Sequence, residues 1–182
     1  MNSDFDLHSI KAIIGLGNPG SSYARNRHSI GFRVVDALAN TFHASWQSGD
    51  LMEHATIAIM DTAGRSHTMY LIKPQTFMNN SGRVLPWLTK KGIKPDQILV
   101  LHDELEKPFG KLILKFGGSH KGHNGLKSII GVIGAEFWRL GLGIGRPVDK
   151  NAVSEYVLSN FSPDEEARVP ELIDQAVALI VK

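Results

Sequence analysis

The sequence predicts a single α/β domain in which helices flank a mixed, twisted β-sheet. Short apolar runs alternate with segments whose apolar residues recur at helical spacing, an order that is typical of α/β proteins. A length of 182 residues and a hydrophobic fraction of 42% fit one domain that spans residues 1–182. A chain of this size buries roughly 70% of the surface that it exposes when unfolded.

Local patterns predict the elements in order. Residues 11–17 are an apolar run that ends at Asn-Pro-Gly, which indicates a buried strand followed by a loop. Apolar residues then recur every four positions from Ile30 to Phe42, the pattern of an amphipathic helix. A capping box at Ser162 predicts a last helix that begins at Pro163. Between them we expect strands at 55–60, 67–74, 98–102, 111–116 and 138–144 and helices at 82–91 and 126–133.

Two residues suggest acid–base chemistry. His28 directly precedes the first long helix, and Asp103 follows the apolar run 98–102. Ligands bind beyond the carboxyl ends of strands in open α/β sheets, so Asp103 is well placed to orient the imidazole of His28 if the strands are neighbours. The chain has no cysteine and no Gly-x-Ser-x-Gly motif. We therefore expect His28 to activate water as a general base.

Three asparagines lie in separate glycine-rich or turn-rich loops. They are Asn18, Asn79 and Asn124. An amide side chain can orient a carbonyl group or stabilise an oxyanion. Loop asparagines also commonly bond to their own backbone, so each of them alone has a structural alternative.

Positive charge is concentrated in residues 107–146. This segment has seven Lys or Arg residues and one acidic residue, a net charge of +6, whereas the rest of the chain carries −4. Clustered cations favour a polyanionic partner because they release phosphate counterions on binding. A solvated surface without a partner is the alternative.

The sequence also contains parts of two other kinds of site. Residues 15–20 fit the Gly-x-Gly-x-x-Gly pattern of dinucleotide-binding loops, but Pro19 removes a backbone donor and Asp36 falls inside the predicted helix. His102, Asp103, His120 and His123 offer metal-ligating groups. The glycines beside His123 leave no helix to set the ligand spacing, so we expect no metal and no cofactor.

The N-terminal segment suggests a cytoplasmic protein. It is acidic and lacks the basic-then-apolar order of a secretion signal. No apolar run approaches the ~20 residues that cross a bilayer.

Taken together, six ordered motifs resemble the bacterial-type peptidyl-tRNA hydrolase family, over about residues 12–161. The motifs are Gly-Leu-Gly-Asn-Pro-Gly-x-x-Tyr (15–23), Arg-His-x-x-Gly (27–31), Lys-Pro-Gln-Thr-Phe-Met-Asn-x-Ser-Gly (73–82), His-Asp-Glu-Leu (102–105), Gly-His-Asn-Gly-Leu-Lys (122–127) and Gly-Ile-Gly-Arg-Pro (143–147).

The resemblance implies a monomeric α/β hydrolase that cleaves the ester between a peptide and the tRNA 3′ ribose, and so recycles tRNA from peptidyl-tRNA released by stalled ribosomes. It places the catalytic histidine at His28, the acid that supports it at Asp103, and the asparagine that recognises the peptide at Asn18. It implies contacts with the tRNA or the peptide end at Tyr23, Phe77, Met78, Asn79 and Asn124. In the basic segment we expect Lys111, Lys115 and Lys121 to contact acceptor-stem phosphates.

The sequence departs from this family at Gly141, where many members carry an arginine. This departure weakens the expectation that the strand 138–144 supplies a second phosphate contact beyond Arg139. The rival from another class is an RNA-binding module on the same fold that has lost catalysis.

Overall fold

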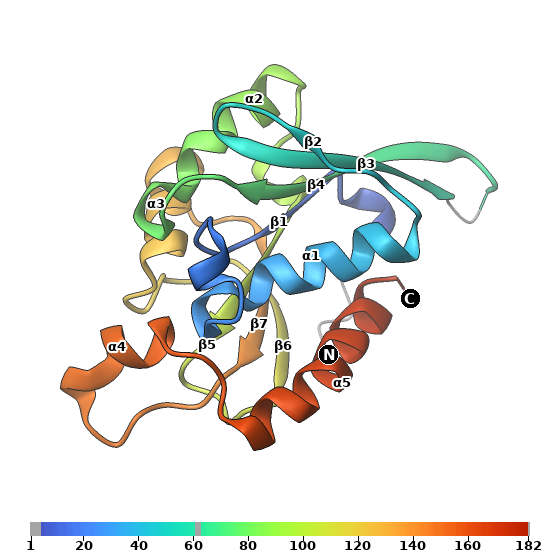
Figure 1. The fold of residues 1–182 in the computed structure, drawn as a ribbon. Coiled ribbons are helices and arrows are strands. Elements are labelled where there is room, and N and C mark those ends of the chain that lie inside the picture. Colours follow the sequence, from blue (N-terminus) through green and yellow to red (C-terminus); the bar gives the residue numbers. More distant parts are fainter. Residues whose placement is uncertain (1–4, 61–62, 182) are drawn as a thin grey trace.

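A seven-stranded mixed sheet forms the centre of the computed structural model, which describes residues 5–60 and 63–181 (Figure 1). The strands lie in the order β2-β3-β4-β1-β5-β7-β6. The four inner strands β4, β1, β5 and β7 run parallel, while β2, β3 and β6 are antiparallel to their neighbours. The strands are β1 (Ala12–Gly15), β2 (Gln47–Ser48), β3 (Met52–Met60), β4 (Ser66–Pro74), β5 (Ile98–Glu104), β6 (Leu112–Phe116) and β7 (Trp138–Gly143).

Helices cover both faces of the sheet. One face carries α1 and α5, and the other carries α2 and α3 (Figure 1). Among the described residues, no helix combines the length and the apolar character needed to span a membrane. The helices are α1 (Ile30–Thr41), α2 (Leu85–Lys90), α3 (Asn124–Ile133), α4 (Val153–Leu158) and α5 (Pro163–Ile180).

The alternation of side chains along the inner strands creates two apolar layers. Ile13 and Leu101 face α1 and α5, whereas Ile14 and Val100 face α2 and α3. Both layers are fully buried, because parallel strands with helices on both sides have no wet face. Runs such as Ile98 to Leu101 are therefore continuously apolar rather than alternating.

The predicted α/β fold class is confirmed, and so are most of the elements. The capping box is present: Ser162 Oγ accepts from the Glu165 N–H, and Glu165 accepts from the Ser162 N–H. The predicted helix 82–91 is wrong at its start. A 3₁₀ helix covers Met78–Val84, and α2 then begins at Leu85 with Pro86 in its first turn.

Two short elements, β2 and α4, were not predicted from the sequence. Residues 1–4, which belong to the acidic N-terminal segment on which the predicted localisation rests, lie outside the described residues.

A close approach between α1 and the sheet determines where α1 begins. At Gly31 an added Cβ would lie 2.5 Å from the carbonyl oxygen of Leu101 and 2.5 Å from the amide nitrogen of Leu16. Only glycine lets the first turn of α1 rest on the backbone at the ends of β1 and β5. The 3₁₀ turn Arg27–Ser29 is thereby held beside the end of β5.

We expect Gly31→Ala to destabilise the protein by about 2 kcal/mol or more, because the new methyl group overlaps backbone atoms that cannot move aside. Gly131 in α3 is the matched control, since an added Cβ there meets nothing within 4 Å. Gly131→Ala should stabilise by about 0.5–1 kcal/mol. Urea unfolding of both variants measures the difference, and equal stabilities would contradict this account of α1.

Candidate active site

A cavity of about 890 Å³ opens at the carboxyl ends of β1, β4 and β5. Its lining residues come from the loops after these strands, from the turn before α3 and from α4. This is the edge where open α/β sheets bind ligands. The predicted site residues that line it are Asn18, Tyr23, His28, Phe77, Met78, Asn79, Asp103, Lys115, Lys121 and Asn124.

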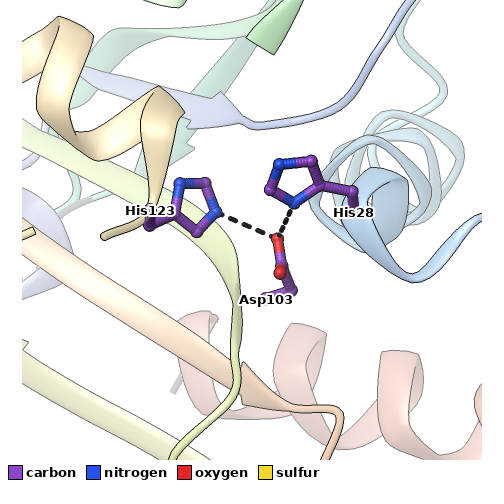
Figure 2. A group of neighbouring side chains, drawn as sticks. All are labelled: His28, Asp103 and His123. Carbon is purple, nitrogen blue, oxygen red and sulfur yellow. Dashed lines mark hydrogen bonds and ion pairs between the residues drawn. The ribbon is translucent and has the colours of Figure 1, made fainter. Parts of the chain in front are cut away.

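His28 and Asp103 are in direct contact. The Nδ1 atom of His28 lies 2.8 Å from Oδ1 of Asp103, and both side chains are buried (Figure 2). Asp103 follows Leu101 by two residues, so it faces the α1 side of β5, where the turn before α1 presents His28. With Nδ1 donating to the carboxylate, the proton-free Nε2 of His28 can accept a proton.

His123 contacts the same carboxylate oxygen. Its Nε2 lies 2.9 Å from Asp103 Oδ1 (Figure 2). Its Nδ1 accepts the N–H groups of Gly125 at 3.1 Å and Leu126 at 3.3 Å, which makes His123 the N-cap of α3. Because Nδ1 is an acceptor, the proton of neutral His123 must be on Nε2, and Nε2 donates to Asp103. One carboxylate oxygen therefore accepts two imidazole N–H groups.

The pKa values of this group follow from burial and from these bonds. Burial alone would lower the pKa of His28, but the charge and hydrogen bond of Asp103 outweigh it and raise the pKa above the ordinary 6.5. Burial would raise the pKa of Asp103, yet His28 and His123 hold it well below 3.8. Asp103 is thus ionised and His28 is a strengthened base.

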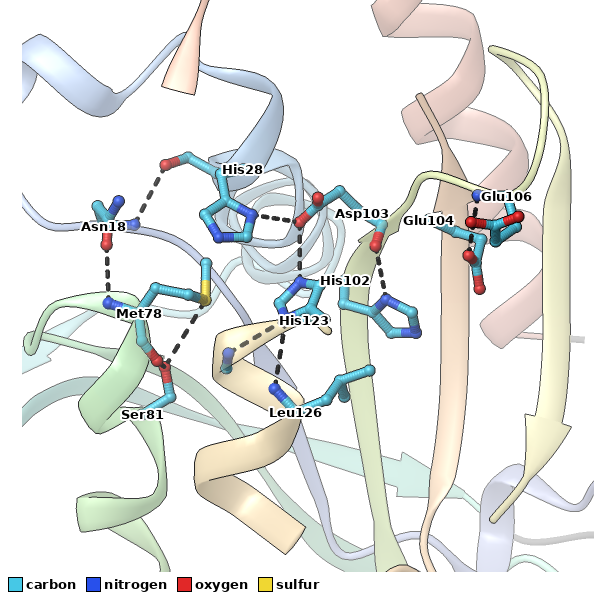
Figure 3. A network of polar contacts seen from close by, with 12 residues as sticks. Asn18, His28, Met78, Ser81, His102, Asp103, Glu104, Glu106, His123 and Leu126 are labelled. Atoms are coloured by element: carbon cyan, nitrogen blue, oxygen red, sulfur yellow. Dashed lines mark hydrogen bonds and ion pairs between the residues drawn. The ribbon is translucent and has the colours of Figure 1, made fainter. Parts of the chain in front are cut away.

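His102 stays neutral on the other side of β5 (Figure 3). Burial, followed by the nearby His123, lowers the pKa of His102 to about 3. Its Nδ1 donates to the backbone carbonyl of Asp103 at 2.7 Å. This bond helps to hold the end of β5, where Asp103 lies.

A metal ion fits this group poorly. The ligand atoms of His28, Asp103 and His123 lie within 4.8 Å of one another, which is close enough to share an ion. However, Nδ1 of His123 caps α3, so a metal at Nε2 would require either an imidazolate or the loss of the cap. The Nδ1 atom of His120, another metal-ligating group in the sequence, accepts the Gly122 N–H.

Asn18 presents its amide in one orientation. Its side-chain Oδ1 accepts the Met78 N–H at 2.8 Å, and the backbone N–H of Asn18 donates to Ser29 Oγ at 3.2 Å (Figure 3). The side chain is buried at the cavity wall. Because Oδ1 is occupied, the Nδ2 donors are the groups that Asn18 can offer to a ligand.

The rim of the cavity is more exposed. Phe77 is 58% exposed, and its ring packs edge to face on Tyr23 with 6.1 Å between the centroids. Asn79 and Asn124 are also exposed, whereas Met78 is buried beneath them. The rim therefore combines aromatic faces with amide groups.

The basic side chains of residues 107–146 differ in how they lie relative to the cavity. Lys115 and Lys121 line the cavity, and burial together with the charge of Lys121 lowers the pKa of Lys115. Lys111 is exposed but lies outside the cavity, just before β6. The expectation that Arg139 contacts phosphate is wrong. Its side chain is fully buried and donates to the carbonyls of Gly118, Ser119 and Ala135, so that it supports the glycine-rich loop before α3.

Comparison with known proteins identifies the family. The sequence model described as peptidyl-tRNA hydrolase matches residues 12–182. The chain belongs to the peptidyl-tRNA hydrolase family. Members of this family hydrolyse peptidyl-tRNA.

Individual relatives are similar over most of their length. The peptidyl-tRNA hydrolase of Mycobacterium tuberculosis is 43% identical over 90% of this chain and 85% of its own. That of Aquifex aeolicus is 41% identical over 95% of this chain and 89% of its own. The crystal structure of the Acinetobacter baumannii enzyme superposes with a TM-score of 0.87 at 37% identity, covering 97% of this chain and 89% of that one.

Some residues of the candidate site were not assigned from the sequence. The sequence indicates His123 only as a metal ligand, because histidine is not among the usual N-cap residues and the helix was expected from residue 126, whereas α3 begins at Asn124. Glu106 and Arg146 form an ion pair of 2.5 Å at the cavity. The wall formed by α4 was missed because six residues are too few for a clear helical period.

We expect Asp103→Asn to lower the pKa of His28, because the variant loses the charge that raises it. Titration of the His28 ring by NMR measures the change. Asp96→Asn is the matched control: it removes one charge just before β5, at the end of the strand opposite to Asp103. An unchanged pKa in Asp103→Asn would show that the observed contact does not strengthen the base.

Proposed function

We propose that this chain hydrolyses the ester bond between a peptide and the 3′ ribose of tRNA, with His28 as the general base. The observation that carries the proposal is the His28–Asp103 contact at the cavity wall, which leaves Nε2 of His28 proton-free. Membership of the peptidyl-tRNA hydrolase family supports the substrate.

The reaction needs only water and the groups of this site. Nε2 of His28 takes a proton from water as the water oxygen attacks the ester carbonyl carbon. Asp103 stabilises the imidazolium that forms, as the carboxylate does in a catalytic triad. The tetrahedral intermediate then expels the 3′ oxygen of the ribose, and the imidazolium returns the proton to that oxygen. His123 contributes by keeping Asp103 ionised.

The asparagines have complementary roles in this proposal. The oriented Nδ2 of Asn18 donates to a carbonyl of the peptide and thereby favours substrates with a blocked amino group. Asn79 and Asn124 lie on separate elements at the rim and can face the oxyanion from two directions. One preorganised donor to an oxyanion contributes about 3 kcal/mol to lowering the barrier.

The tRNA is held by stacking and by charge. Tyr23 and Phe77 offer aromatic faces for unpaired bases at the 3′ end. Lys115 and Lys121, with Lys111 outside the cavity, contact phosphates of the acceptor stem. We propose a monomeric, cytoplasmic enzyme of one domain, in keeping with the family to which the chain belongs.

His28→Ala should reduce cleavage of N-acetylated aminoacyl-tRNA by about 10²–10⁴-fold, the usual contribution of a general base. The free aminoacyl-tRNA should be a poor substrate for the unaltered enzyme. Release of tRNA measured with both substrates tests the two expectations. If His28→Ala retains full activity, the assignment of the base is wrong; if the unaltered protein binds tRNA without cleaving either substrate, it is an RNA-binding module.

The rate should increase with pH through the raised pKa of His28, because only the neutral ring accepts a proton. The midpoint of the kcat/KM profile is therefore expected above 6.5. Asp103→Asn should move this midpoint to lower pH and reduce the plateau by about a hundredfold or more, since the imidazolium loses its carboxylate. A plateau that does not change would contradict the role of Asp103.

Lys115→Glu should weaken tRNA binding and reduce its salt dependence, because a phosphate contact is lost. Cleavage of a minimal nucleotide ester should change little. Lys94→Glu is the control with the same change of charge, at an exposed position before β5 and remote from Asp103. Equal damage to the tRNA substrate and the minimal ester would show that Lys115 acts on the chemistry rather than on the tRNA.

A further inference from the structure

We propose that Arg27 is a positioning residue that fixes the direction of His28 by fastening the turn that carries it to α4 and α5. This inference rests on the proposed function, because it concerns the orientation of the base in that reaction. Arg27 belongs to the Arg-His-x-x-Gly motif, yet no step of the reaction uses it.

The backbone of this turn is attached to the segment between α4 and α5. The Arg27 N–H donates to the carbonyl of Ser159 at 3.0 Å, and Asn26 forms an antiparallel bridge with Asn160. These contacts join parts of the chain that are more than 130 residues apart. The turn Arg27–Ser29 is therefore stabilised by residues that are distant from it in the sequence.

The Arg27 side chain makes the attachment specific. Its side chain is only 7% exposed. Nη1 donates to Ser159 Oγ at 2.7 Å and to the Asn160 carbonyl at 2.6 Å, while Nη2 donates to Glu165 Oε2 at 2.6 Å. The same Glu165 oxygen accepts the Ser162 N–H, so the guanidinium is part of the N-terminal cap of α5.

Two aromatic rings enclose the guanidinium. Its central carbon lies 4.2 Å from the centroid of Tyr156 and 5.2 Å from that of Phe161. The hydroxyl of Tyr156 in turn donates to the Ile144 carbonyl at 2.6 Å, which connects α4 to the end of β7. A planar group with several donors suits this place, whereas a lysine can satisfy one or two of the acceptors and cannot stack.

The bonds of Arg27 fix the position of His28 and, at the same time, the position of the cavity wall formed by α4. His28 is the next residue in the turn, and α4 lines the cavity through Val153, Val157 and Leu158. The groups that face the His28 ring are Asp103 and His123. The charge of Arg27 is paired with Glu165, so Arg27 influences His28 through its position.

The test compares Arg27→Lys with Arg33→Lys. Arg33 also binds α5, through two hydrogen bonds to Glu166 at 3.0 and 3.1 Å, but it lies in α1 and makes no bond to the segment after α4. Arg27→Lys should lower kcat by about tenfold to a hundredfold, because small misplacements of a catalytic group are costly. It should also lower the pKa of His28, since a looser contact with Asp103 raises it less.

Arg33→Lys should leave kcat and the His28 pKa unchanged, even if both variants unfold at lower temperature. Ser159→Ala, which removes one acceptor of Arg27, should shift both quantities in the same direction by a smaller amount and serves if Arg27→Lys does not fold. A role of Arg27 in stability alone would lower the unfolding temperature without changing the His28 pKa or kcat.

His28→Ala separates the two claims. If Arg27→Lys and Ser159→Ala keep kcat and the His28 pKa unchanged while His28→Ala loses activity, the positioning role is wrong and the proposed function stands. If His28→Ala is active, the proposed function fails, and the His28 pKa in Arg27→Lys still reports whether Arg27 holds the ring against Asp103.

Discussion

An ionised carboxylate in a buried position is the constraint on which this structure depends. Asp103 has almost no contact with water, and its charge is stable there because His28 and His123 both donate to Oδ1. A buried charge without such donors would be neutralised. The two histidines come from different elements, so the end of β5, the start of α1 and the start of α3 must all meet at this atom.

Several separate contacts hold these three elements together around Asp103. Gly31 brings the first turn of α1 against the backbone of the sheet. The cap that His123 makes on α3 aims its Nε2 at Asp103. On the far side, Arg27 connects the His28 turn to α4 and α5. Apart from His123, which also keeps Asp103 ionised, these contacts involve no group that takes part in the proposed reaction.

Local sequence patterns predicted part of the candidate site. His28 before an amphipathic helix and Asp103 after an apolar strand were predicted from the residues alone. Arg139 was misjudged because a charged residue in a basic segment suggests phosphate, whereas its burial and its three carbonyl partners depend on how β7 meets the loop before α3. The helix at 82–91 began elsewhere because the first part of the segment is a 3₁₀ helix that local spacing did not reveal.

The sequence by itself determined the fold class, the cap of α5 and the family motifs, because hydrophobic period and turn chemistry act between near neighbours. Only the tertiary structure decided that His123 and His28 bind the same oxygen of Asp103 and that the Met78 N–H orients the side-chain amide of Asn18. It also decided that Arg27 binds residues 159–165. Such contacts join residues that are 20 to 138 positions apart. Their geometry exists only after the sheet has brought the loops to one edge.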